Sequence, residues 1–288
     1  MIYELKHNNI LLKVDSSGAE AICLIYKDIH ILRSKDEIWG RTAPLLFPNV
    51  GCLKDNYTII EGKKYPLTKH GFLRDSEFDL FYKDESSITL VNKCNDKTLS
   101  MFPFKYEAYV TYTISEKKVK TAIKIKNVDE VSFKYNIGGH PGFNCPFYKD
   151  ESFNDYKIIF EEEETFDSPS YCDGLWDFDN PFVSFKKIKD IKLDYKYFMI
   201  DAFFIKNIKS KKVSLLNKEG KGINFYFEGF NTLAFWTKPN AKYLCLEPWC
   251  GYDDLIESDH IFNKKDDLIE IKPGEEKEVS YCIEAQFD

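Results

Sequence analysis

Apolar and polar residues alternate along most of this 288-residue chain, with the period of two that is typical of half-buried β-strands. In the run 119–125, Val119, Ile123 and Ile125 share one side with Thr121, and lysines occupy the other side. The last run, 279–287, repeats the pattern. The same reasoning predicts further strands over residues 10–14, 21–26, 29–33, 58–61, 87–92, 108–115, 156–161, 202–205, 213–216, 223–227, 232–236 and 243–246.

Short polar segments separate these runs at the spacing of β-hairpins, as at residues 61–64, 115–118 and 218–221. Helical periodicity is scarce, and we expect helical turns only near residues 45–47 and 255–262. No linker, internal repeat or break in composition divides the chain. The pattern therefore predicts one all-β domain over residues 1–288, built as a sandwich of large antiparallel sheets.

Composition excludes several classes of protein. Apolar residues make up 43% of the chain and aromatic residues 16%, which suits a globular protein rich in strands. The net charge of −7 and the lack of a long lysine or arginine block argue against a nucleic-acid partner. The chain has neither a long apolar run nor a signal-like start, so we expect a cytoplasmic protein without a membrane partner.

The eight cysteines are scattered, without a Cys-x-x-Cys pair or a histidine at zinc-finger spacing. Structural zinc sites usually show paired ligands of that kind. We therefore expect no bound metal, and free thiols in a reducing compartment.

Four segments combine glycine or proline with aromatic residues and a group that can hold a proton: 40–51, 70–75, 138–144 and 246–254. His140 stands between a glycine pair and Pro-Gly, which indicates a stiff turn that fixes the direction of its imidazole. Glu247 ends an apolar run, so burial is expected to raise its pKa toward values useful for a general base. His70 precedes a polar cluster. Each of these three residues can instead have a purely structural role, since the histidines can cap backbone groups and Glu247 can pair with a lysine.

The same regions hold side chains suited to a sugar ring, which has an apolar face of C–H groups and a rim of hydroxyls. Trp236 is a candidate stacking platform. Only three arginines occur, and two of them, Arg41 and Arg74, fall within these segments, where a bidentate fork can bind oxygen atoms. Asn144 and Asp201 are candidates for hydrogen bonds with hydroxyls.

Four motifs, in this order, resemble the aldose 1-epimerase (mutarotase) family, particularly its bacterial branch related to the lactose-operon X protein. They are Ala-Pro-Leu-Leu-Phe-Pro at 43–48, His-Gly-Phe with a following arginine at 70–74, Gly-His-Pro-Gly-Phe at 139–143 and Leu-Glu-Pro-Trp at 246–249. The likeness runs through nearly the whole chain. It implies a β-supersandwich like that of galactose mutarotase, with an open cleft and no metal or organic cofactor.

By this resemblance, Glu247 is the general base that removes the anomeric O1 proton of a free aldohexose, and His140 is the general acid that protonates the ring oxygen. His70 would hydrogen-bond the sugar near the reacting atoms, and Arg41 and Asp201 would contact its oxygens. The implied activity is interconversion of α and β anomers, by a monomer or a homodimer.

The chain departs from the family pattern at Gly51-Cys52, where relatives often have Gly-Arg. One guanidinium contact is therefore lost, or replaced by Lys54. Two other functions stay open. Anomerisation of a hexose 6-phosphate needs a cationic pocket, which the two arginines of these segments or Lys54 can form. A sugar-binding module without catalysis keeps the aromatic platform but has no need of proton-transfer groups.

Overall fold

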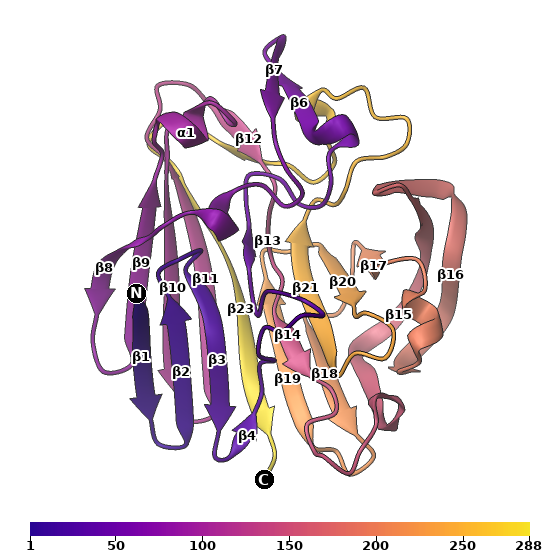
Figure 1. Ribbon diagram of the computed structural model, residues 1–288. Helices are drawn as coiled ribbons and strands as arrows, with labels where there is room; N and C mark the ends of the chain where they lie inside the picture. The colour runs from indigo at the N-terminus through magenta and orange to yellow at the C-terminus, as the bar shows by residue number, and fades with distance from the viewer.

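The predicted strands form two facing layers of antiparallel sheet in the computed structural model, which describes residues 1–288 (Figure 1). One layer is a single nine-stranded sheet. Its strands, in order across the sheet, are β16 (Leu175–Lys192), β15 (Tyr156–Cys172), β18 (Lys212–Asn217), β19 (Gly222–Glu228), β23 (Glu276–Gln286), β11 (Lys118–Asn127), β10 (Tyr106–Ser115), β9 (Ser87–Lys93) and β8 (Asp79–Lys83).

The other layer contains two smaller sheets, which lie in front of the first in Figure 1. The four N-terminal strands form one of them: β1 (Ile2–His7), β2 (Ile10–Asp15), β3 (Glu20–Tyr26) and β4 (Ile29–His30). The six-stranded sheet has the order β17 (Phe203–Lys206), β20 (Thr232–Trp236), β21 (Tyr243–Cys250), β13 (Ile137–Gly139) and β5 (Leu45–Leu46), and β14 (Gly142–Asn144) also pairs with β21.

Two more strand pairs and a few short helices complete the fold. Strand β6 (Tyr57–Ile60) pairs with β7 (Lys63–Pro66), and β12 (Phe133–Tyr135) pairs with β22 (Ile269–Ile271). The helices are α1 (Asp96–Leu99) and the 3₁₀ turns η1 (Lys54–Asn56), η2 (Leu73–Asp75), η3 (Phe153–Asp155), η4 (Tyr195–Phe198) and η5 (Phe262–Lys264). None of these helices has the length and apolar character needed to span a membrane.

The two layers meet in a core rich in aromatic rings. Phe143 of β14 packs on Phe225 of β19, with ring centroids 5.8 Å apart, and Phe235 of β20 lies 6.2 Å from Phe160 of β15. The Tyr112 hydroxyl on β10 ties the four-stranded sheet to the large sheet. It donates at 2.7 Å to the carbonyl of Ala19, which lies between β2 and β3. Large apolar side chains thus hold the six-stranded sheet firmly against the nine-stranded one.

Each predicted strand overlaps an observed one, although the segment 29–33 contributes only the two-residue strand β4. The expected helical turn at residues 45–47 was wrong, because Leu45 and Leu46 pair with Gly139 and Gly138 of β13. The expected turn at 255–262 yields only η5, which begins at its last residue. Strand β16 was not predicted because it is a largely exposed edge strand with no clean apolar face.

Candidate active site

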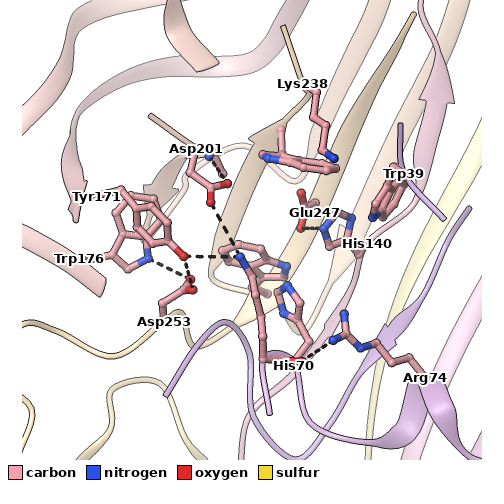
Figure 2. A pocket seen from close by; sticks show the side chains of 14 residues that line it. Trp39, His70, Arg74, His140, Tyr171, Trp176, Asp201, Lys238, Glu247 and Asp253 are labelled. Atoms are coloured by element: carbon pink, nitrogen blue, oxygen red, sulfur yellow. Dashed lines mark hydrogen bonds and ion pairs between the residues drawn. The ribbon is translucent and has the colours of Figure 1, made fainter. Parts of the chain in front are cut away.

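The six-stranded sheet is buried on both faces, and its strands alternate between two environments. On β21, Leu244 and Leu246 face the main core, whereas Glu247 and Trp249 face a cavity of about 250 Å³ (Figure 2). Trp236 on β20 lines the same cavity. Pockets for drug-sized ligands start near 300 Å³, so this cavity suits one smaller molecule.

The register of the strands brings His140 and Glu247 together. Strands β13 and β14 flank His140, and both pair with β21. Gly138 stands opposite Trp249, and β14 continues the same register, so His140 lies opposite Glu247. Side chains that face each other across antiparallel strands are close neighbours. Accordingly, His140 Nε2 lies 3.0 Å from Glu247 Oε2.

Both members of this pair are almost sealed from solvent, with His140 7% exposed and Glu247 1% exposed. Burial lowers the pKa of His140 well below its ordinary value. Burial, reinforced by the charge of Asp201, raises the pKa of Glu247 well above its ordinary value. Glu247 Oε2 and His140 Nδ1 have no hydrogen-bond partner. The pair therefore has unused hydrogen-bonding capacity at the wall of the cavity.

His70 is held by two hydrogen bonds with Gly51. The His70 backbone N–H donates to the Gly51 carbonyl at 2.8 Å, and the Gly51 N–H donates to His70 Nδ1 at 3.0 Å. A neutral imidazole that accepts at Nδ1 carries its proton on Nε2. Burial, followed by the charge of Lys69, lowers the pKa of His70 well below its ordinary value. His70 is thus a neutral donor on the cavity wall.

Gly51 is needed for this arrangement. Its φ is +73°, and a Cβ on it would lie 2.2 Å from the carboxyl carbon of Asp253. Glycine adopts this backbone conformation without strain, and because it has no Cβ it also leaves room for the aspartate.

A lysine and an aspartate from distant segments meet at another part of the cavity. Lys69 Nζ lies 3.8 Å from Asp201 Oδ2, and it donates to the Tyr171 hydroxyl at 3.5 Å. Burial opposes the charge of Lys69, but the carboxylates of Asp253 and Asp201 outweigh it and raise its pKa. Burial also raises the pKa of Asp201, although Lys69 acts in the opposite direction. This region offers an ammonium donor beside a carboxyl acceptor.

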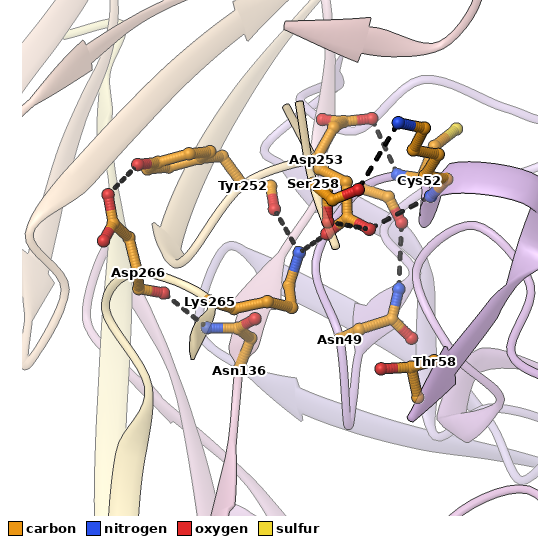
Figure 3. Close-up of polar contacts among 12 residues, drawn as sticks. Asn49, Cys52, Thr58, Asn136, Tyr252, Asp253, Ser258, Lys265 and Asp266 are labelled. Atoms are coloured by element: carbon orange, nitrogen blue, oxygen red, sulfur yellow. Dashed lines mark hydrogen bonds and ion pairs between the residues drawn. The ribbon is translucent and has the colours of Figure 1, made fainter. Parts of the chain in front are cut away.

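The tip of the β15–β16 hairpin closes one side of the cavity. Its residues Tyr171 and Trp176 line the cavity, and the Trp176 backbone N–H donates to the Asp254 carbonyl at 3.0 Å. Asp253 accepts hydrogen bonds from the Cys52 N–H at 2.7 Å, the Tyr171 hydroxyl at 3.2 Å and Trp176 Nε1 at 3.1 Å (Figures 2 and 3). This carboxylate therefore joins the hairpin tip to the Cys52 loop.

The missing arginine at Cys52 is not replaced by Lys54, which corrects that expectation. Lys54 Nζ donates to the carbonyls of Ile256 at 2.6 Å and Ser258 at 3.4 Å, and Lys54 does not line the cavity. The cation that lines the cavity near Cys52 is Lys69, whose charge partly offsets the rise in the Cys52 thiol pKa that burial causes.

An aromatic cluster covers His140. The Trp39 ring lies 4.9 Å from the His140 ring and 5.3 Å from that of Trp236. Arg33 fixes this cluster from outside the cavity, because its guanidinium lies 4.6 Å from the Tyr243 ring centre and donates to the Trp39 carbonyl at 2.7 Å. Of the three arginines, Arg33 therefore supports the wall without lining the cavity.

Six of the sequence-predicted residues line the cavity together, namely His70, Arg74, His140, Asp201, Trp236 and Glu247. Arg41 is placed in an adjoining hollow, where it donates to the Arg74 carbonyl at 3.2 Å and to Asp75 at 2.6 Å. It therefore neighbours the cavity without lining it.

Asn144 lies outside the cavity, which corrects its expected role as a ligand contact. Its side-chain amide donates to the carbonyls of His30 at 2.9 Å and Leu32 at 3.2 Å. Asn144 thus fastens β14 to the end of β4 and to the segment that follows it.

Sequence reasoning missed Trp39, Lys69, Tyr171 and Trp176 as cavity residues. The first two adjoin recognised segments, since Lys69 directly precedes His70 and Trp39 directly precedes the segment 40–51. That adjacency was a usable signal. No signal in the sequence marked Tyr171 and Trp176 as cavity residues, because only the folding of a long hairpin brings them to the cavity.

Comparison with known proteins identifies a family and a fold for this chain. The chain matches the family described as aldose 1-epimerase over residues 1–283. Protein LacX of Lactococcus lactis subsp. lactis is 31% identical over 295 aligned residues, covering 98% of this chain and 99% of LacX. A galactose mutarotase related enzyme from Lactobacillus acidophilus is 28% identical, with a TM-score of 0.93 and coverage of 100% of this chain and 99% of that one.

A galactose mutarotase-like protein from Lactobacillus casei is 23% identical, covers 99% of both chains and has a TM-score of 0.89, so it shares the fold. These likenesses confirm the galactose mutarotase-like β-sandwich. Since the sequence match and LacX both span nearly the whole chain, the chain belongs to the aldose 1-epimerase family.

Proposed function

We propose that this protein is an aldose 1-epimerase, which interconverts the α and β anomers of a free hexose by opening and closing the ring. The observation that carries the proposal is the contact between His140 and Glu247. Two groups able to transfer protons lie 3.0 Å apart, almost fully buried, on the wall of a small cavity. The family to which the chain belongs supports the same class of reaction.

In the proposed reaction, Glu247 accepts the proton of the O1 hydroxyl while His140 donates a proton to the ring oxygen O5. The C1–O5 bond breaks with its electron pair on O5, and the electron pair of the O1–H bond forms the C1–O1 double bond. The product is the open-chain aldehyde. Rotation about C1–C2 and the reverse transfers close the other anomer. O1 and O5 are bonded to the same carbon, so two adjacent groups can serve both.

In this scheme, Glu247 and His140 share one transferable proton, which lies either on the carboxylate of Glu247 or on the imidazole of His140. A carboxylate beside an imidazolium is the reactive arrangement, and a carboxylic acid beside a neutral imidazole is the result of ring opening. Burial raises the pKa of Glu247 and lowers that of His140, so the neutral arrangement is favoured at rest. Neither arrangement gives the pair a net charge, which is what a buried site tolerates best. The rate should fall at low pH, where the pair gains a second proton, and at high pH, where it loses its proton.

Other cavity residues are suited to the rest of the sugar. The His70 Nε2–H is positioned to donate to an oxygen near the reacting centre, because its Nδ1 is occupied by Gly51. Lys69 and Asp201 supply a donor and an acceptor for hydroxyls, and the Trp236 ring offers an apolar surface for C–H groups.

The charge of the cavity supports a neutral hexose over a hexose phosphate. Three cationic side chains, Lys69, Arg74 and Lys238, line the cavity beside the carboxyl groups of Asp201 and Asp253, in addition to Glu247, which is protonated in the resting arrangement. A phosphate site usually presents several cations without neighbouring carboxylates.

Polarimetry of freshly dissolved α-D-galactose, α-D-glucose and α-D-glucose 6-phosphate tests the proposal. We expect the protein to accelerate equilibration of a free hexose, and Glu247→Gln to lower kcat by roughly 10²- to 10⁴-fold, the usual contribution of a general base. Glu164→Gln is the matched control, since Glu164 is also a buried glutamate but lies outside the cavity.

Wild-type protein that does not accelerate equilibration of any free aldose would contradict the proposal. Acceleration confined to the phosphorylated sugar would instead identify a phosphosugar epimerase. Binding of galactose without acceleration would identify a sugar-binding protein.

A further inference from the structure

A cysteine lies beside the proposed catalytic pair. Cys245 and Glu247 are two residues apart on β21, so both side chains lie on the same face of the strand. One ligating atom from each of His140, Cys245 and Glu247 can be chosen so that all three lie within 4.8 Å of one another. Imidazole nitrogen, thiolate sulfur and carboxylate oxygen are the three ligand types of protein zinc sites.

The donors of this cluster are not committed elsewhere. Glu247 Oε2 and His140 Nδ1 have no hydrogen-bond partner, although both residues are more than nine-tenths buried. The Cys250 thiol on the same strand donates to the Gly229 carbonyl at 3.1 Å, whereas the Cys245 thiol makes no such bond. A bound ion is one of the recognised explanations for buried polar groups without partners.

We propose that His140, Cys245 and Glu247 form a binding site for Zn²⁺, and that bound Zn²⁺ blocks the proposed epimerase reaction. Zinc–ligand bonds of about 2.0 to 2.3 Å place tetrahedral ligand atoms about 3.5 Å apart, so a separation of 4.8 Å would shorten by about 1.3 Å, and the His140–Glu247 contact at 3.0 Å would widen by about 0.5 Å. Inhibition follows because the metal would occupy both proton-transfer groups.

The binding part of this proposal is independent of the proposed function, and the inhibition part rests on it. Metal binding requires a deprotonated thiol, so binding of Zn²⁺ would displace the proton of Cys245.

Cobalt(II) spectroscopy tests the site without reference to activity. We expect the metal-free full chain to bind Co²⁺ with a thiolate-to-cobalt charge-transfer band, which Zn²⁺ abolishes by displacement. Cys245→Ser should remove this band and weaken Zn²⁺ binding by roughly tenfold or more, since loss of even an outer-shell partner costs that much. Cys250→Ser is the matched control, because Cys250 is buried on the same strand but pairs elsewhere. Thermal unfolding verifies that each variant is folded, and Cys245→Ala is a second variant at the site.

The outcomes separate the two proposals. Absence of a thiolate band in the wild type, or its persistence in both Cys245 variants, would overturn the metal site. A band in protein that does not accelerate mutarotation would support the site and contradict the proposed function. In an active enzyme, Zn²⁺ should inhibit the wild type and the Cys250→Ser variant at concentrations at which Cys245→Ser stays active, and equal inhibition of all three would overturn the proposed block.

Discussion

Two glutamates of this chain are equally withdrawn from solvent, yet their surroundings are opposite. Glu164 on β15 is 2% exposed and accepts hydrogen bonds from the Ser210 backbone N–H at 2.8 Å and the Ser210 hydroxyl at 2.7 Å. Glu247 on β21 is 1% exposed, and its Oε2 has no hydrogen bond, only the contact with His140. One carboxyl is satisfied by the protein, and the other is left available for a ligand.

The difference separates a structural role from a proposed catalytic one. A buried polar group without a partner costs about 1 to 3 kcal/mol of stability, so it is retained where binding or chemistry uses it. Glu164 and Asp253 have donors supplied by the fold, and they hold loops in place. Glu247 and His140 are held by the sheet, which leaves their polar atoms free to act.

The largest expected effect is on catalysis at the unsatisfied pair. His140→Asn removes the proposed general acid, and we expect kcat for hexose mutarotation to fall by roughly 10²- to 10⁴-fold. Polarimetry measures the loss. His260→Asn is a suitable control, because His260 stacks on Tyr57 outside the cavity and has a positive φ, which asparagine tolerates. Full activity in the His140 variant would assign the histidine a structural role.

A smaller effect is expected on stability at the satisfied glutamate. Glu164→Ala leaves the Ser210 N–H and hydroxyl without their acceptor, and we expect a loss of about 1 to 3 kcal/mol in the free energy of unfolding. Urea unfolding followed by circular dichroism measures it. Glu247→Ala strands no backbone donor, so its cost should be lower. Equal costs for the two variants would break the contrast between the two sites.

The smallest effect concerns pH. Burial raises the folded-state pKa of Glu247 above its unfolded value, so the stabilisation from its bound proton is complete below the unfolded pKa and is lost as the pH rises through the folded pKa. Glutamine cannot ionise. Thermal unfolding over a range of pH values should therefore show Glu247→Gln gaining stability relative to the wild type as the pH rises above the ordinary glutamate pKa of 4.5. A difference that stays constant across this range would show that Glu247 binds its proton no more tightly in the folded protein.

The alternation of apolar and polar residues was sufficient to predict most strands, because a half-buried strand shows this alternation whichever strand it pairs with. Strands β10 and β11 alternate between buried and more exposed positions as expected. The pattern failed at Leu45 and Leu46, whose strand exists only because β13 provides a partner from a distant segment. The four successive glutamates at 161–164 indicate a solvated edge, and this expectation was wrong for Glu164, which a shift in strand register turns into the interior.

The sequence alone determined the all-β class and marked His70, His140 and Glu247, because their glycine- and proline-rich surroundings are local features. Tertiary structure alone decided that His140 meets Glu247 through a shared strand register, that Lys69 rather than Lys54 supplies the cation near Cys52, and that Asn144 serves the backbone. The physical reason is that each of these outcomes depends on which partner a strand or side chain finds across the fold, and alternation along one segment carries no information about that partner.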